Sequence, residues 1–233
     1  MFFADPYYLI YMAPAFLLML LTTWYVKSTY RRWGRVPARS QMSGYQAAQR
    51  LIAAGSLNGV QIEGAAGNLT DHYDPRRKVL SLSRGVAEST SVAAVAVAAH
   101  ELGHAMQDAE DYLPLRFRAA LVPMVNIGSY LGWILIVLGL LLRWLDLAWL
   151  GVFAFAGGAI FSLATIPVEL NASARARRLL TNAGIIQSED EQRGVNNVLN
   201  AAALTYVAAL VTAAMQLLYY VSLVGGLGGR RRS

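Results

Sequence analysis

Residues Ser91 to Glu110 read SVAAVAVAAHELGHAMQDAE and predict one continuous helix. The part that leads into the two histidines contains neither glycine nor proline and is rich in alanine, the best helix former. Ser89, Thr90 or Ser91 can cap the N-terminus of this helix. Pro114 interrupts the helical pattern a few residues after its end.

Within this helix, His100-Glu101-Leu102-Gly103-His104 has the residue types and the spacing of a zinc-binding catalytic helix. Histidines four apart lie on one face of a helix, so both imidazoles can reach one metal ion. Glu101 projects beside that face, where a carboxylate can act as general base without being a ligand. The alternative is a helix whose two histidines are satisfied by local hydrogen bonds, but the helical context favours zinc.

The composition predicts a membrane protein. Of the 233 residues, 56% are hydrophobic and only 15% are charged, with a mean hydropathy of +0.39. Cysteine is absent, so any zinc must be held by histidine nitrogen and carboxylate oxygen. The net charge of +6 comes with no nucleic-acid recognition motif, and clustered arginine sets topology in membrane proteins. We therefore expect the lipid bilayer, and not nucleic acid, as a partner.

Four apolar stretches are long enough to cross a bilayer: residues 7–26, 119–142, 147–167 and 201–224. Met1–Asp5 carries no positive charge, so we expect the first stretch to be an anchor and not a cleaved signal peptide. Basic residues from Lys27 to Arg39 follow it, which predicts an external N-terminus and a cytoplasmic segment after the anchor. Four crossings would place Arg230–Arg232 outside, against the same rule. Either this tail is an exception or one stretch does not cross.

The predicted fold is a mainly α integral membrane protein of about four transmembrane helices, with a small α+β zincin-like cytoplasmic domain that carries the HExxH helix. In this domain residues 43–54 predict a helix, whereas 60–63 and 79–83 alternate like strands. An edge strand could pair with an extended peptide substrate. About 85 residues are marginal for an independent core, so support from the membrane spans is expected. The predicted segments are a transmembrane anchor (1–30), the soluble domain (31–117), a transmembrane hairpin (118–167), a cytoplasmic helical segment with the third zinc ligand (168–200), and a C-terminal transmembrane helix with a basic tail (201–233).

Glu169 is the predicted third ligand. The hairpin crosses the membrane twice and returns the chain to the side of His100 and His104, and Glu169 is the first acidic residue after it. Two histidines and one glutamate leave the fourth zinc position to water, which is the arrangement of catalytic sites. The alternative is that Glu169, near the start of a helix, only interacts favourably with the helix dipole.

His72 is the remaining histidine, in the polar segment Asn68–Pro75 that ends in a turn. Three roles are open for it. It could be a zinc ligand, it could contact substrate or transition state near the predicted edge strand, or it could have a structural role.

The motifs Asn68-x-x-Asp71-His72-Tyr73-Asp74-Pro75, His100-Glu101-Leu102-Gly103-His104-Ala105-x-Gln107 and Pro167-Val168-Glu169-x-Asn171-Ala172-Ser173 resemble those of bacterial membrane-bound neutral zinc metallopeptidases of the YugP type. The likeness covers essentially the whole chain. More distantly the chain is similar to the HtpX and CAAX prenyl protease group, which also has a membrane hairpin between HExxH and a glutamate ligand.

The resemblance implies that His100, His104 and Glu169 are the zinc ligands and that Glu101 is the general base. Ser173 stands where the distant group usually has an aspartate, four residues after the ligand glutamate. We therefore expect the support of the zinc site to differ from that group's. Besides His72, we expect Asn171 and Ser173 to support the ligands or contact the substrate.

Together these features predict a membrane-embedded zinc endopeptidase of the gluzincin type, at the bacterial inner membrane with its active site facing the cytoplasm. Its substrates would be unfolded or membrane-proximal polypeptides. The alternative is a non-catalytic membrane scaffold stabilised by zinc, which would not need Glu101 and would tend to use a fourth protein ligand such as His72. A transporter has less support, because the spans contain almost no ionisable residue.

Overall fold

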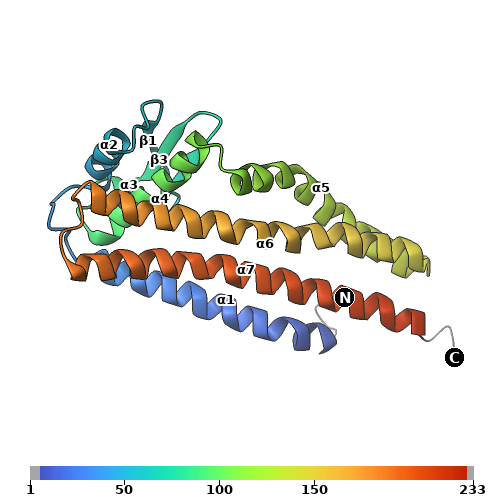
Figure 1. Ribbon diagram of the computed structural model, residues 1–233. Helices are drawn as coiled ribbons and strands as arrows, with labels where there is room; N and C mark the ends of the chain where they lie inside the picture. The colour runs from blue at the N-terminus through green and yellow to red at the C-terminus, as the bar shows by residue number, and fades with distance from the viewer. Residues whose placement is uncertain (1–5, 230–233) are drawn as a thin grey trace. The chain divides into compact units, whose positions relative to one another are not determined.

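The computed structural model describes residues 6–229, which form a mainly helical protein with one small sheet (Figure 1). By their internal contacts the residues divide into two compact units. The helical unit contains residues up to Thr22, Arg116–Ile166 and residues from Thr205 onward; the mixed unit contains Thr23–Leu115 and Pro167–Leu204. The elements in chain order are α1 (Pro6–Trp33), α2 (Gly44–Ala54), β1 (Gln61–Ala65), β2 (His72–Asp74), β3 (Val79–Ser83), α3 (Arg84–Ala87), α4 (Val92–Ala109), α5 (Leu113–Leu141), α6 (Leu145–Asn182) and α7 (Glu189–Gly229).

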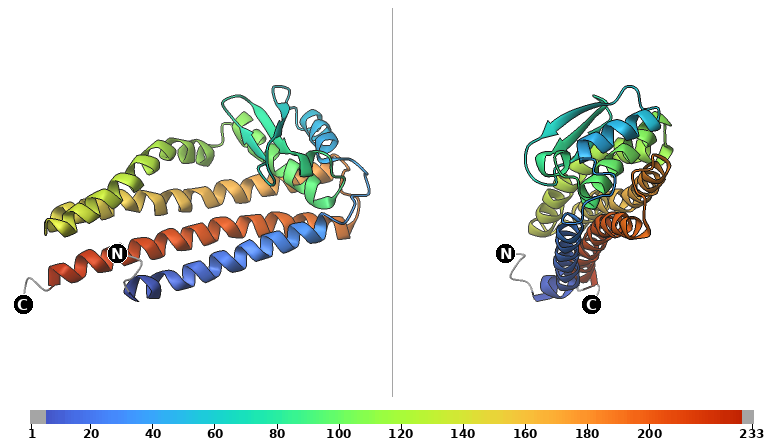
Figure 2. Two further views of the ribbon diagram at one scale, coloured as in Figure 1. Left: turned by 180° about the vertical axis from the view of Figure 1, so that it is seen from behind. Right: turned by 90° about the vertical axis from the view of Figure 1, so that its left-hand side faces the viewer.

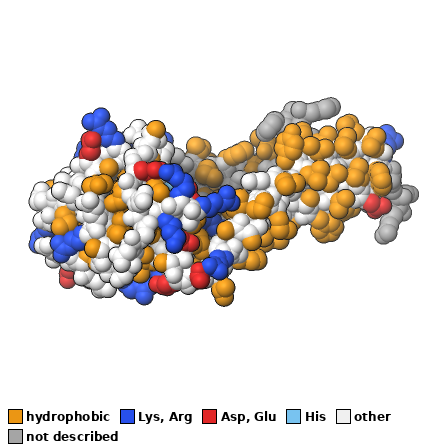
Figure 3. All heavy atoms as spheres, turned by 90° about the horizontal axis from the view of Figure 1, so that it is seen from above, with side chains coloured by type: hydrophobic (Ala, Val, Ile, Leu, Met, Phe, Trp, Pro, Cys, Tyr) orange, Lys and Arg blue, Asp and Glu red, His pale blue; other side chains and the backbone are white. Residues whose placement is uncertain are grey.

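Four of the described helices, α1, α5, α6 and α7, are long and apolar enough to cross a membrane. They contain the four apolar stretches predicted from the sequence. On the face drawn in Figure 3, apolar side chains gather on one part of the surface, where few charged side chains lie. Pro114 lies in the first turn of α5, where its missing N–H costs no hydrogen bond. The predicted conflict at Arg230–Arg232 lies outside the described residues.

Small residues allow α5 and α6 to approach closely within the helical unit. A Cβ atom added to Gly132 would lie 2.8 Å from the carbonyl oxygen of Gly151, and one added to Gly139 would collide with the backbone of Ala148. Such contacts between backbones are typical of helix pairs in membranes, where small residues replace bulky ones at the interface. The two helices are joined at Leu142–Trp144, within the predicted hairpin.

The sheet has the strand order β1-β3-β2, with β1 parallel and β2 antiparallel to β3. All five residues of β3 are buried, as expected of a central strand. The predicted strands at 60–63 and 79–83 are confirmed within one or two residues. β2 was not predicted, since the short polar segment around His72 has no apolar alternation. It becomes a strand through its pairing with β3.

Helix α4 forms the centre of the mixed unit and packs against α2, α3 and the strands β2 and β3 (Figure 2). The side chain of Ser91 accepts a hydrogen bond from the backbone N–H of Ala94, which confirms the predicted N-terminal cap. Apolar residues after the hairpin share the same core, among them Leu180, Ile185, Val195 and Leu199. The segment 31–117, expected to be marginal alone, is therefore packed together with residues that follow the hairpin in sequence.

Candidate metal centre

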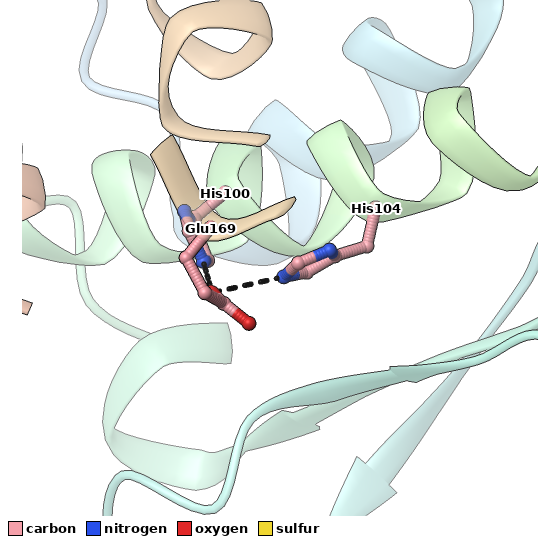
Figure 4. A group of neighbouring side chains, drawn as sticks. All are labelled: His100, His104 and Glu169. Atoms are coloured by element: carbon pink, nitrogen blue, oxygen red, sulfur yellow. Dashed lines mark hydrogen bonds and ion pairs between the residues drawn. The ribbon is translucent and has the colours of Figure 1, made fainter. Parts of the chain in front are cut away.

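The side chains of His100, His104 and Glu169 converge on one point (Figure 4). The Oε2 atom of Glu169 lies 3.2 Å from Nε2 of His100 and 3.4 Å from Nε2 of His104. One donor atom of each residue lies within 4.8 Å of the other two. Within residues 6–229 this is the one group of three or more such side chains with metal-binding spacing. It consists of the three ligands predicted from the sequence.

The donor set fits zinc. Two imidazole nitrogens and one carboxylate oxygen are ordinary zinc ligands, and three protein ligands are the number found in catalytic zinc sites. Glu169 is only 2% exposed. Because a buried carboxylate requires nearby positive charge, a divalent cation bound among these three atoms would compensate it.

A glycine brings the two ligand-bearing helices together. Gly103 lies between the two histidines, and a Cβ atom at this position would collide with the carbonyl oxygen of Ala172 in α6. The backbones of α4 and α6 are therefore in direct contact one turn beyond Glu169. The sequence predicted Glu169 near the start of a helix. Instead, it lies deep inside α6. The helix-dipole alternative is wrong, because that effect is confined to the first turn.

Ser173 supports the first histidine. Its Oγ atom lies 3.2 Å from Nδ1 of His100, and the residue is 2% exposed. Nε2 of the same ring faces Glu169. A hydroxyl can donate or accept, so this contact orients the ring of His100 but does not fix which nitrogen carries the proton.

Gln107 supports the second histidine. Its Oε1 atom lies 3.0 Å from Nδ1 of His104, and its Nε2 donates to the carbonyl oxygen of Val168 (2.8 Å) and to Oδ1 of Asn171 (3.0 Å). Asn171 thus contacts the residue that supports a ligand. Gln107 belongs to the motif that carries the family resemblance but was not predicted to be a site residue. The available signal was its spacing, because a residue three positions after His104 lies on the same helix face.

Glu101 lies beside the ligand group and is held by β2. One of its carboxylate oxygens, Oε2, accepts a hydrogen bond of 3.1 Å from the backbone N–H of Tyr73. The hydroxyl of Tyr73 donates to Asp108, two turns further along α4 (2.9 Å). Burial raises the pKa of Glu101, although the nearby His100 and His104 oppose this shift.

His72 is not part of the ligand group. Side chains alternate along a strand, and Tyr73 faces α4, so its neighbour His72 faces the opposite side of the sheet. There it aligns with Ser81 and Glu63 across the three strands. His72 is exposed, and its Nδ1 lies 2.9 Å from the carbonyl oxygen of Thr70. Of its three possible roles, this geometry favours the structural one.

Comparison with known proteins identifies the family. Residues 8–225 match the family described as "Putative neutral zinc metallopeptidase". The chain belongs to this family. A curated relative, "Putative membrane protease YugP" of Bacillus subtilis (strain 168), is 42% identical over 205 residues, which are 88% of this chain and 90% of the relative. No solved structure matches the chain.

Family membership agrees with the geometry on two points. The family name implies zinc, and the three donor atoms of His100, His104 and Glu169 suit that ion. The relative is described as a membrane protease, and the chain has four candidate membrane-spanning helices. The chain is therefore a multi-pass membrane protein of the YugP type. The more distant similarity to the HtpX group stays a prediction.

Proposed function

We propose that this protein is a zinc-dependent endopeptidase of the bacterial inner membrane, with its active site facing the cytoplasm. The observation that carries the proposal is the group of three donor atoms within 4.8 Å, formed by His100, His104 and Glu169, with Glu101 next to it on the same helix. The family description and the name of the curated relative support it. When bound, zinc supplies a Lewis acid that polarises a peptide carbonyl and makes an attacking water more acidic.

Glu101 is the proposed general base. Its carboxylate accepts a proton from the attacking water as the new C–O bond forms, and then donates that proton to the leaving amine nitrogen as the C–N bond breaks. Burial raises the pKa of Glu101, which makes the carboxylate a stronger base than an exposed glutamate. The backbone N–H of Tyr73 holds one oxygen of this carboxylate in place.

The proposed substrates are unfolded or membrane-proximal polypeptides. α6 carries both an apolar stretch long enough to span the membrane and the ligand Glu169. The helix α4, which carries His100 and His104, ends at Ala109, a few residues before the candidate membrane-spanning helix α5 begins. The cytoplasmic orientation is supported by the basic residues between Lys27 and Arg39, which follow the first span.

The proposal is tested with the full chain purified in detergent, incubated with an unfolded protein such as casein, and assayed for bound zinc. We expect Glu101→Gln to retain zinc at the wild-type level and to lose about 100-fold or more of the hydrolysis rate, because only the proton transfer is removed. Glu88→Gln is the matched control, since Glu88 is exposed and pairs only with Arg84 one turn before it.

Three outcomes would contradict parts of the proposal. Full hydrolysis by Glu101→Gln would refute the general base. Zinc in every variant with no hydrolysis by any would favour the scaffold, the second candidate function. Absence of zinc from the wild type would refute the metal site itself. The three-membered ligand group now favours the enzyme, because a structural zinc site is normally closed by a fourth protein ligand and His72 lies apart from the group.

A further inference from the structure

A line of polar side chains connects the surface of the mixed unit to His104. Nη1 of Arg175 lies 2.6 Å from Oε1 of Glu110, which is half exposed, and Nε of Arg175 donates to Oδ1 of Asn171 at 2.7 Å. The same Oδ1 accepts a hydrogen bond from Nε2 of Gln107 (3.0 Å), whose Oε1 lies 3.0 Å from Nδ1 of His104. Gln107 is completely buried, so these bonds do not compete with water.

The direction of each hydrogen bond in this line follows from the bond that Arg175 donates to Asn171. A guanidinium only donates, so Asn171 must turn its oxygen toward Arg175. The same oxygen, together with the carbonyl of Val168, then requires the NH₂ group of Gln107 as donor. Both hydrogens of this NH₂ group are thereby used. The oxygen of Gln107 faces His104, and an amide oxygen can only accept, so Nδ1 of His104 must carry a proton.

We infer that Gln107 is a positioning residue that fixes the Nδ1–H tautomer of His104 and so presents the lone pair of Nε2 to the metal. This inference rests on the proposed zinc site. Histidine ligands commonly donate their second ring N–H to a fixed acceptor, which sets the orientation of the ring. The acceptor here is a neutral amide. Its own orientation is set by Asn171 and Arg175 on α6, the helix that also carries Glu169.

His100 and His104 differ in the group that contacts their Nδ1 atoms. Nδ1 of His100 contacts the hydroxyl of Ser173, which can rotate and can serve as donor or acceptor. Nδ1 of His104 contacts the oxygen of an amide whose nitrogen is fixed by two acceptors, the carbonyl of Val168 and Oδ1 of Asn171. The contacts of His104 therefore fix the Nδ1–H tautomer, whereas those of His100 allow either tautomer.

The experiment uses the full chain in detergent, labelled with ¹⁵N at histidine and loaded with zinc. The chain has three histidines, so the spectrum of ring nitrogens is small, and His72→Gln removes the signals of the exposed one. For His104 we expect a protonated, slowly exchanging Nδ1 and a zinc-bound Nε2. A His104 bound to zinc through Nδ1, or without a proton on Nδ1, would overturn the inference.

Substitutions test the role of the acceptor. Gln107→Met keeps the approximate volume but removes the acceptor, and we expect the zinc Kd, measured by chelator competition, to rise about 10–100-fold. Gln107→Glu retains an acceptor for Nδ1–H but loses the NH₂ donor to Val168 and Asn171, so we expect it to recover only a small part of that affinity. Gln49→Met is the matched control, because Gln49 is exposed on α2 and bonds Tyr45.

The outcomes separate this inference from the proposed function. Wild-type zinc affinity together with an unchanged His104 signal in Gln107→Met would refute the role of Gln107. Zinc binding with the expected tautomer but without hydrolysis would refute the peptidase and leave the positioning role standing. Absence of zinc from the wild type would overturn both. Should Gln107→Met fail to fold, the tautomer of the wild type decides.

Discussion

At the scale of single residues, the acidic neighbours of His104 favour its charged form. Burial opposes that form, but the hydrogen bond with Glu169 and the negative charges of Glu101 and Glu169 outweigh burial and raise the pKa of His104 above its ordinary value. Zinc requires a deprotonated imidazole nitrogen. Metal and proton therefore compete for the same side chain.

We expect the stabilisation by zinc to increase with pH. In the metal-free protein the raised pKa of His104 means that its stabilising charge is fully present below the unfolded-state pKa, about 6.5, and is lost as the pH rises through the folded-state pKa. Adding zinc to chelator-treated protein should thus raise the Tm little near about pH 5.5 and much more near about pH 8. Tryptophan fluorescence reports the Tm, and His72→Gln should behave like the wild type. An equal zinc-induced shift at both pH values would contradict the prediction.

The group His100, His104 and Glu169 could be predicted from the sequence, and Asn171 and Ser173 were expected beside it, whereas Gln107 was not. His100 and His104 are separated by one helical turn, so their spacing alone places them together. The hydrogen bonds of Gln107 depend on Val168 and Asn171, which are more than 60 positions away. No local pattern of residues contains that contact. Only the packing of α4 on α6 creates it.

At the scale of elements, boundaries set by local hydrogen bonds were predictable. The helix predicted at 43–54 is confirmed as α2, which the capping box of Ser43 and Gln46 starts and Gly55 follows. β2 could not be predicted, because its three residues become a strand only by pairing with β3. The interior position of Glu169 was also missed. A helix start close to Glu169 was expected, yet α6 continues through Pro167, since a membrane-spanning helix can tolerate one missing backbone hydrogen bond.

The contact between α4 and α6 at Gly103 can be tested by one substitution. Gly103→Ala places a methyl group against the carbonyl of Ala172, so the helices must separate or strain. We expect this variant to lose about 1–3 kcal/mol of stability and to bind zinc more weakly, because Glu169 moves away from the histidines. Gly85→Ala is the control, since a Cβ atom there meets nothing within 4 Å. Unchanged Tm and zinc affinity in Gly103→Ala would show that this contact does not set the site.

At the scale of the whole molecule, the mixed unit is built from two separate pieces of the chain. Thr23–Leu115 supplies the sheet and α4, and Pro167–Leu204 supplies the remainder. The four spans predicted by hydropathy correspond to four long helices, because length and apolar character are properties of the local sequence. The sequence placed 168–200 on the same side of the membrane as 31–117, with Glu169 as the link between them. The hydrophobic core that these segments share was not visible, since it depends on buried contacts between distant residues.

The proposed orientation can be tested with single cysteines, since the natural chain has none. In right-side-out spheroplasts, a membrane-impermeant maleimide should label Trp144→Cys, in the link between α5 and α6, and should not label Asn58→Cys, in the exposed loop before β1. The expected difference follows from an external N-terminus and four crossings. Lysed cells, in which both positions should react, are the control. The opposite pattern in spheroplasts would invert the proposed topology.

The separation of the ligands along the chain has a consequence for biosynthesis. Glu169 leaves the ribosome 69 residues after His100, and the sequence between them contains the whole of α5 and the apolar part of α6. A nascent chain that has been translated only as far as this hairpin carries both histidines and the proposed general base Glu101, but it lacks Glu169. The complete zinc site therefore cannot exist until the hairpin has been made. If the proposed function holds, the peptidase lacks its full metal site while it is being synthesised.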